Sequence, residues 1–169
     1  MDFELDDEQG ALRDAVRGLL KGYDPATSFE HRREVTAADP GYDEALWGRL
    51  AEMGLLGLPF AEADGGMGAG PVEVALVAEE IGRVLAPEPY VAAVALAGGL
   101  VAALGSDEQR ADVLGAIASG ERLATFATGE IAEPVIQGAR ADVIVWEVDG
   151  EVFLVDRPAD ATAYRTHDG

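Results

Sequence analysis

The run from Leu55 to Pro89 constrains the fold of this chain more than any other part of its sequence. It opens with an apolar stretch that we expect to form a short strand, and four closely spaced glycines follow: Gly65, Gly66, Gly68 and Gly70. A helix is expected to begin at Pro71, because proline is favoured in the first turn of a helix. Since the glycine segment precedes a helix without a Walker lysine, we interpret it as a structural turn rather than a phosphate-binding loop.

Apolar residues at helical spacing predict five helices before residue 121. The first begins after Asp6 and the last after Ser106, and in both a glutamine three residues further on completes a capping box. The other three are expected over 42–53, 71–85 and 90–104. The polar segment between the first two helices is a connection with room for a short helix.

The helix expected over 90–104 carries two adjacent glycines, Gly98 and Gly99. Glycine weakens the interior of a helix, and it is also the residue that allows another group to approach the backbone closely. The pair therefore indicates either a weak point in this helix or a close contact with another backbone or a ligand.

The periodicity changes after Glu121. Runs of β-branched and aromatic residues predict strands over 123–128, 143–146 and 152–155. Asp149-Gly150 separates the last two runs, and this dipeptide between apolar runs is a strong hairpin signal. Helices followed by strands predict an α+β chain.

Composition excludes several classes of function. With 49% hydrophobic residues among 169, the chain can bury a sizeable core. A formal charge of −20 disfavours nucleic acid and anionic membranes as partners, and the longest apolar stretch, 90–104, is too short to span a bilayer. The absence of cysteine excludes disulfides and zinc–thiolate sites, and no metal-ligand cluster is evident. The acidic amino terminus does not read as a signal peptide, so we expect a cytoplasmic protein.

Two groups of titratable residues favour structural interpretations over catalytic ones. Glu79 and Glu80 are adjacent, and neighbouring helix positions point about 100° apart, so the two carboxylates cannot share one substrate. Surface and interhelical ion pairs are expected instead. His31 and His167 lie far apart in polar segments and are expected to be solvated.

The order of motifs along the chain resembles the acyl-CoA dehydrogenase family. In chain order the motifs are Glu8-Gln9 with Leu12-Arg13, Trp47-x-x-Leu50-Ala51-Glu52-Met53-Gly54-Leu55, the glycine turn, Glu79-Glu80-Ile81-Gly82-Arg83, Gly105-Ser106-Asp107-Glu108-Gln109 and Ser119-Gly120-Glu121. The resemblance implies an α+β fold with an acyl-CoA dehydrogenase-like amino-terminal all-α domain, 1–121, followed by part of a β-barrel-like middle domain, 122–169.

The resemblance also implies a reaction, the α,β-dehydrogenation of an acyl-CoA thioester. In the family a carboxylate removes the α proton, FAD accepts the β hydrogen as hydride, and hydrogen bonds to the thioester carbonyl acidify the α carbon. The family's carboxylate base belongs to a carboxy-terminal four-helix bundle. We expect that base in the missing carboxy-terminal part or in a partner subunit, and we assign no catalytic residue in this chain.

FAD is the cofactor that the resemblance implies, and three residues of the first predicted strand are its candidate contacts. Thr128 matches the family threonine that holds the flavin ring, and Thr125 and Ala127 lie on the same strand. FAD is expected to be bound mainly by, or together with, a partner subunit.

Several family positions around the flavin are altered. Thr125 stands where the family has an aromatic residue, and Gly129 where it has glutamate. Pro134 and Ile136 replace the tryptophan and threonine of the next family motif. Only Gly129 to Glu133 separates the two motifs, where the family has a few tens of residues. These departures predict an eroded flavin site.

Ala92 and Leu96 are the candidate substrate contacts, because the family helix at this position lines the acyl cavity. The small residues around them would leave a wide cavity beside the helix. The alternative for this helix is close packing within the helical core.

These observations favour an acyl-CoA dehydrogenase-type subunit that pairs with a catalytically competent second subunit, with acyl-CoA as substrate. Some members of the family that act on bulky acyl chains, including steroid side chains, are heteromers in which one subunit has an eroded flavin site, so the resemblance implies a bulky or steroid side-chain acyl group here. Assembly with a second copy of the chain stays open, and the alternative function is a non-catalytic interaction or scaffold module that retains the fold.

Overall fold

The computed structural model describes residues 4–23, 28–129, 135–159 and 162. The α-helices are α1 (Asp7–Leu19), α2 (Phe29–Ala37), α3 (Glu44–Glu52), α4 (Pro71–Arg83), α5 (Gly99–Leu104) and α6 (Asp107–Ala118). Three 3₁₀ turns, η1 (Leu20–Tyr23), η2 (Leu55–Gly57) and η3 (Glu62–Asp64), and a π-helical segment, η4 (Val91–Gly98), complete the helical part. The strands are β1 (Ala124–Thr128), β2 (Val143–Val148) and β3 (Glu151–Asp156). The predicted α+β class is confirmed.

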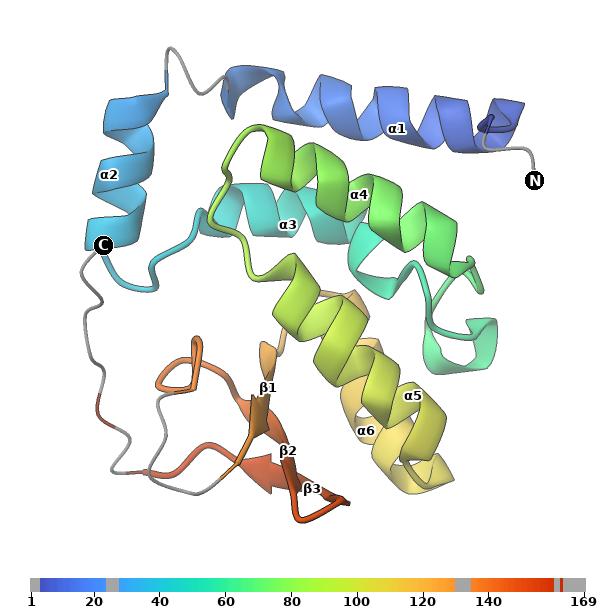
Figure 1. The fold of residues 1–169 in the computed structure, drawn as a ribbon, viewed down its shortest axis with the longest axis vertical. Helices are drawn as coiled ribbons and strands as arrows, with labels where there is room; N and C mark the ends of the chain where they lie inside the picture. The colour runs from blue at the N-terminus through green and yellow to red at the C-terminus, as the bar shows by residue number, and fades with distance from the viewer. Residues whose placement is uncertain (1–3, 24–27, 130–134, 160–161, 163–169) are drawn as a thin grey trace.

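The helices form one layer and the small sheet lies beside it (Figure 1). α1 runs alongside α4, α3 is seen behind α4 in this view, and α2 stands at the end of this group. The continuous helical rod made by η4 and α5 lies between the helices and the sheet, and η4 contacts β1. The amino-terminal part of the sheet is thereby held against the helical layer.

Both predicted capping boxes are confirmed. The side chain of Asp6 accepts the N–H of Gln9, whose own side chain accepts the N–H of Asp6. Ser106 and Gln109 make the same pair of bonds at the start of α6. The Gln9 side chain also donates to Glu73 Oε1 at 2.8 Å, which connects the first turns of α1 and α4.

The strand predicted after Gly54 is wrong, because this stretch forms the 3₁₀ turn η2. Its backbone groups bond to the glycine turn rather than to a sheet: Gly68 donates to the carbonyl of Phe60 at 2.7 Å and Ala69 to that of Leu58 at 2.9 Å. A Cβ atom at Gly66 would lie 2.1 Å from the Phe60 carbonyl oxygen, so only glycine fits there. The glycine turn therefore packs its backbone against the backbone of residues 57–60, which is consistent with its interpretation as a structural turn.

The helix predicted over 90–104 forms, but in two parts. Its first part is the π-helical η4 and its second is α5. A Cβ at Gly98 would lie 2.4 Å from Cζ of Phe60, whereas a Cβ at Gly99 would meet nothing within 4 Å. The expected close contact is therefore real at Gly98 and is made with a buried aromatic ring.

The sheet has the order β1-β2-β3. β1 and β2 are parallel, with Ala124 opposite Val143, and β2 and β3 are antiparallel. Asp149 and Gly150 have φ of 54° and 81°, the left-handed values that a tight hairpin turn requires, so the predicted hairpin is confirmed. The predicted connection 130–133 and Pro134 lie outside the described residues, as does His167.

One hydrophobic core joins the helices to the sheet. Its fully buried members include Val16 of α1, Leu50 of α3, Tyr90 before η4, Leu114 of α6 and Ala124 of β1. None of the helices in the described part of the chain has the length and apolar character that a membrane crossing needs.

Candidate functional site

β1 carries the three residues predicted to contact the flavin, and their side chains differ in solvent exposure. Thr125 is fully buried, and its hydroxyl donates to the backbone carbonyl of Ile136 at 2.7 Å. Ala127 is also buried, whereas Thr128 is exposed at the end of the strand. Of the two candidate hydroxyl groups, the Thr128 hydroxyl is therefore the one that faces outward.

The segment after β1 folds back onto the strand. Besides the bond between Thr125 and Ile136, the indole Nε1 of Trp146 donates to the Gly129 carbonyl at 2.9 Å. Among the described residues β1 is an edge strand of the sheet, and Thr128 is exposed at its end. Thr125, Ala127 and Thr128 line neither of the two grooves described below.

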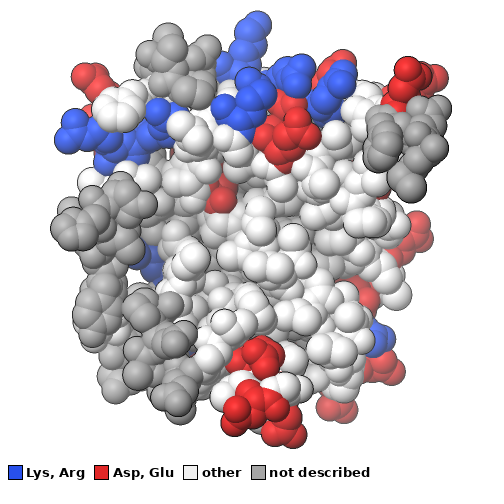
Figure 2. All heavy atoms as spheres, viewed as in Figure 1, with Lys and Arg blue, Asp and Glu red and all other residues white. Residues whose placement is uncertain are grey.

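Ala92 and Leu96, the predicted substrate contacts, lie on η4 and face away from the core. Ala92 is half-buried and Leu96 is 44% exposed. Val91 before them and Leu104 at the end of α5 are also exposed. Figure 2 shows a broad uncharged face over this helical rod. The structure thus brings the two predicted contacts together on one apolar surface.

This apolar surface continues into a groove of about 50 Å³ between α5 and the β2–β3 hairpin. Leu100 and Leu104 of α5 line one side, and Val145 and Phe153 line the other. Leu104 and Phe153 are 63% and 46% exposed. Large apolar side chains exposed over adjoining elements mark a surface that another molecule or domain covers.

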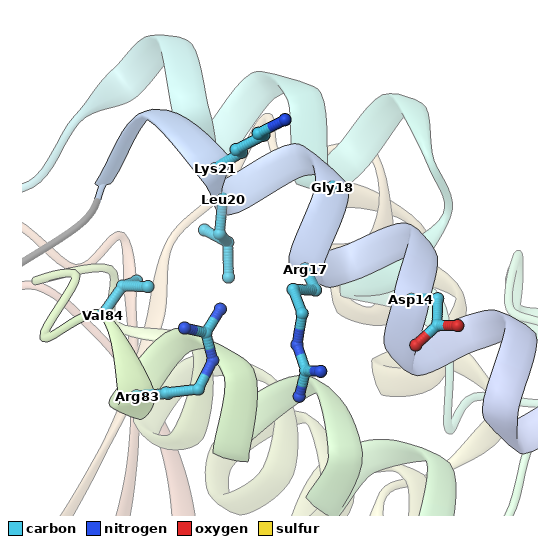
Figure 3. A pocket seen from close by; sticks show the side chains of 7 residues that line it. All are labelled: Asp14, Arg17, Gly18, Leu20, Lys21, Arg83 and Val84. Atoms are coloured by element: carbon cyan, nitrogen blue, oxygen red, sulfur yellow. The ribbon is translucent and has the colours of Figure 1, made fainter.

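A second groove, of about 440 Å³, lies between α1 and α4 and is lined by cations (Figure 3). Arg17, Lys21 and Arg83 border it, and the buried carboxylate of Glu80 lies between the two arginines. Arg17 Nη2 is 2.5 Å from Glu80 Oε1, and Arg83 Nε is 2.7 Å from Oε2. The Arg17 hydrogen bond, followed by the contribution of Arg83, outweighs burial and lowers the pKa of Glu80.

The cations of this groove have a structural explanation. Arg17 and Arg83 lie in the last turns of α1 and α4, and Lys21 lies in η1 directly after α1. Basic residues at helix carboxyl ends complement the helix dipole. Figure 2 shows Lys and Arg gathered along this edge of the molecule, over α1 and α2. The interhelical ion pair expected for the Glu79–Glu80 pair is present at Glu80.

A cluster around Glu88 is the feature that the sequence did not reveal. Glu88 is buried beside Asp43, whose carboxylate also contacts Tyr23 and His31. His31 is exposed, as expected for a solvated histidine, but it has an acidic partner. The one available signal was an acidic residue between two prolines, Pro87 and Pro89, in an otherwise apolar stretch. Within the described ranges, no three His, Asp or Glu side chains are grouped so as to hold a metal ion.

Comparisons with known proteins give the family. Residues 6–121 match the family model of the acyl-CoA dehydrogenase N-terminal domain. Acyl-CoA dehydrogenase FadE27 of Mycobacterium tuberculosis is 34% identical over 143 residues, covering 82% of this chain and 37% of its own length. Acyl-CoA dehydrogenase IpdE2 of the same organism is 32% identical over 150 residues, covering 86% of this chain and 44% of its own length.

Solved structures give the same result. The ChsE4–ChsE5 complex of Mycobacterium tuberculosis contains a chain with a TM-score of 0.78 and 30% identity, matched over 92% of this chain and 49% of that one. The structure of Tcur3481–Tcur3483, a steroid ACAD (acyl-CoA dehydrogenase), has a TM-score of 0.75 and 26% identity. The match covers 89% of this chain and 48% of that one. The chain spans less than half the length of these relatives. From the matched sequence, the shared fold and the order of its motifs, the chain belongs to the acyl-CoA dehydrogenase family.

Proposed function

We propose that this chain is a subunit of a heteromeric FAD-dependent acyl-CoA dehydrogenase, and that a second, catalytically competent subunit of the same family supplies most of the flavin site. The assembly would carry out α,β-dehydrogenation of an acyl-CoA in the cytoplasm. The family's FAD would accept the hydride, and the carboxylate base would come from outside residues 1–169.

The observation that carries this proposal is the hydrogen bond between the Thr125 hydroxyl and the Ile136 carbonyl. It directs a candidate flavin contact into the protein, and Ile136 itself stands where the family has a threonine. Thr128 and the edge of β1 remain available. β1 can contact one side of the flavin ring but lacks the side chains to enclose it. This fits a flavin site shared with a partner subunit better than a site formed by this chain alone.

The apolar surface over η4 and α5 supports the assignment of Ala92 and Leu96 to the acyl side of the site. An acyl chain is recognised mainly by apolar surface, and Leu96 and Leu104 present such surface without a charged side chain between them. Relatives include a steroid ACAD, which supports a bulky acyl group as substrate.

The test is to express the chain alone and together with each acyl-CoA dehydrogenase-type subunit encoded beside it, and to measure native mass and flavin absorbance. We expect no flavin in the chain alone, and a complex that holds less than one flavin per chain and is bleached by an acyl-CoA. Flavin in the lone chain that an acyl-CoA bleaches would overturn the proposal. A chain that binds neither flavin nor a family partner would support the scaffold alternative instead.

A further inference from the structure

The groove between α1 and α4 holds hydrogen-bond donors that its own ion pair leaves unused. Arg17 donates to Glu80 through Nε and Nη2, and Arg83 donates to it through Nε alone. Among the described residues, no acceptor contacts Nη1 of Arg17, either Nη group of Arg83 or the ammonium group of Lys21. The side chains of Arg17 and Arg83 are 50% and 44% exposed, so these donors are open to solvent.

The two guanidinium groups are fixed in position by the carboxylate behind them. Glu80 is 1% exposed, and it binds one arginine from each of the two helices. Figure 3 shows Arg17 reaching from α1 toward α4 and Arg83 reaching from α4 toward α1, with Leu20 beside them. A guanidinium group that is already held in one orientation loses less conformational entropy when it binds a ligand. Glu80 therefore prepares the free N–H groups of both arginines for an acceptor.

The charges around the groove favour an anion as that acceptor. Asp14 is paired with Arg13 at 2.9 Å, and Glu80 neutralises one of its two arginines. The cation that remains and Lys21 outweigh the one further carboxylate, the exposed Glu79 of α4, by a single positive charge. The region of the groove is thus positive within a chain whose net charge is −20.

The ends of α1 and α4 also lie at this groove, and they act against an anion. The C-cap residues of the two helices are Leu20 and Val84, and both line the groove. Carboxyl ends of helices carry partial negative charge. Arg32 of α2 donates to the Val84 carbonyl at 3.0 Å, which offsets this effect at α4. The attraction for an anion therefore comes from the guanidinium and ammonium groups.

We propose that the groove between α1 and α4 binds a phosphate group, either as the inorganic ion or as the ester of a small molecule. The free N–H groups of Arg17 and Arg83 would donate to its oxygens, and Lys21 would add its charge from the rim. Arginine suits this role because its planar donors bind phosphate through two parallel hydrogen bonds. A volume of about 440 Å³ leaves room for an organic group on the phosphate.

The site does not depend on the proposed function. Of the described residues that line the groove, none belongs to the candidate flavin contacts on β1 or to the candidate acyl contacts on η4. Near pH 7 a phosphate monoester carries a charge of about −1.5 to −2, which two guanidinium groups and one ammonium group can complement.

The test is a titration of the chain with phenyl phosphate, inorganic phosphate and phenol at constant ionic strength and neutral pH, followed by ¹H–¹⁵N NMR. We expect saturable shifts of the side-chain Nε–H groups of Arg17 and Arg83 and of the backbone amides of 17–21 with both phosphates, and none with phenol. Tighter binding of phenyl phosphate would identify an ester as the ligand. Equal binding of the two would identify the phosphate group alone.

Two variants change different parts of the site. Arg83→Lys keeps a charge beside Glu80 but removes the free Nη groups, so it should weaken the binding of phenyl phosphate about five-fold. Lys21→Gln removes an exposed charge and should weaken it about two-fold. Arg49→Lys makes the first substitution in the last turn of α3, outside the groove, and should bind like the unaltered chain.

Two outcomes would overturn the proposal. Shifts that grow without saturation, or that are equally large around Arg49, would show only a general attraction between anions and cationic side chains. Saturable binding that neither Arg83→Lys nor Lys21→Gln weakens would place the phosphate elsewhere on the chain. Lys21 lies outside the Glu80 ion pair, so Lys21→Gln keeps the test decisive even if Arg83→Lys disturbs the fold.

Discussion

Arg17 of α1 binds both carboxyl oxygens of Glu80 of α4, with Nη2 at 2.5 Å from Oε1 and Nε at 3.1 Å from Oε2. Glu80 is 1% exposed, while the side chains of Arg17 and Arg83 are 50% and 44% exposed. The carboxylate of Glu80 is thus enclosed by protein, whereas the guanidinium groups of Arg17 and Arg83 are partly exposed to solvent. A single buried charge connects two helices whose residues are 63 positions apart in sequence.

Replacing Glu80 by alanine should destabilise the chain by about 2 kcal/mol. The estimate lies below that for a fully buried ion pair, because both arginines are half exposed to water and can be solvated. Urea unfolding of Glu80→Ala against the unaltered chain measures the loss, with Glu79→Ala as the exposed neighbour for comparison. Equal effects of the two substitutions would contradict the structural role of Glu80.

The same ion pair predicts a pH dependence. The pKa of Glu80 is lowered in the folded chain, so its contribution to stability is complete above the ordinary carboxyl pKa and is lost as the pH falls through the folded value. The unaltered chain should therefore lose more stability on acidification than Glu80→Gln, and the two unfolding midpoints should converge at low pH. Parallel curves would show that the carboxylate charge does not contribute.

Gly98 and Gly99 should respond oppositely to alanine. At Gly98 the new Cβ would meet the Phe60 ring, and overpacking of this kind costs about 1–3 kcal/mol. At Gly99 the Cβ would enter open space within the helix, which should stabilise it by about 0.5–1 kcal/mol. Thermal unfolding of the two single variants provides the comparison. A stabilised Gly98→Ala would mean that η4 does not pack on Phe60 as described.

Substitution of Thr125 should lower the stability of the chain, whereas substitution of Thr128 should lower flavin binding. Thr125→Val removes a buried hydroxyl that donates to Ile136 and should cost about 1 kcal/mol of folding free energy. Thr128→Val alters an exposed side chain and should leave stability unchanged while lowering the flavin content of the heteromeric complex. The reverse pattern, with flavin lost only in Thr125→Val, would show that Thr125 turns outward in the assembly.

Leu96→Glu tests the apolar surface over η4 and α5. Leu96 is 44% exposed, so a charge there is hydrated in the lone chain and should change its stability by about 0.5 kcal/mol or less. In the proposed complex the same charge would be buried against apolar surface, so co-purification of the partner subunit or turnover of acyl-CoA should fall sharply. Glu108→Gln, on an exposed position of α6, serves as a control for a change of charge elsewhere.

The sequence predicted well those parts of the fold that depend on nearby residues. The capping boxes at Asp6 and Ser106 and the hairpin turn at Asp149 each require residues within three or four positions, so their pattern is complete in the sequence. The stretch after Gly54 was mistaken for a strand because a short apolar run looks the same in a 3₁₀ turn and in a strand. Its true partner, the glycine turn, became visible only in three dimensions.

The sites depend on residues that are distant in sequence, and this limited their prediction. Asp43 and Glu88 are 45 positions apart, and no local pattern indicates that the amide of one faces the carboxyl of the other. The bond from Thr125 to Ile136 joins β1 to the connection between β1 and β2, and the strand pattern did not indicate how that connection folds. The family resemblance supplied Thr128 and Leu96, but their exposure became known only from the packing.

The outer edge of β3 has a consequence for how the chain behaves in solution. In the described part of the chain β3 pairs with β2 alone, and Val152, Phe153 and Val155 are 39%, 46% and 36% exposed. An open, apolar edge strand is a template for pairing with another molecule. The net charge of −20 opposes such contacts by long-range repulsion, which salt screens within about 10 Å at 0.1 M. We therefore expect solutions of the isolated chain to scatter more light as the ionic strength rises.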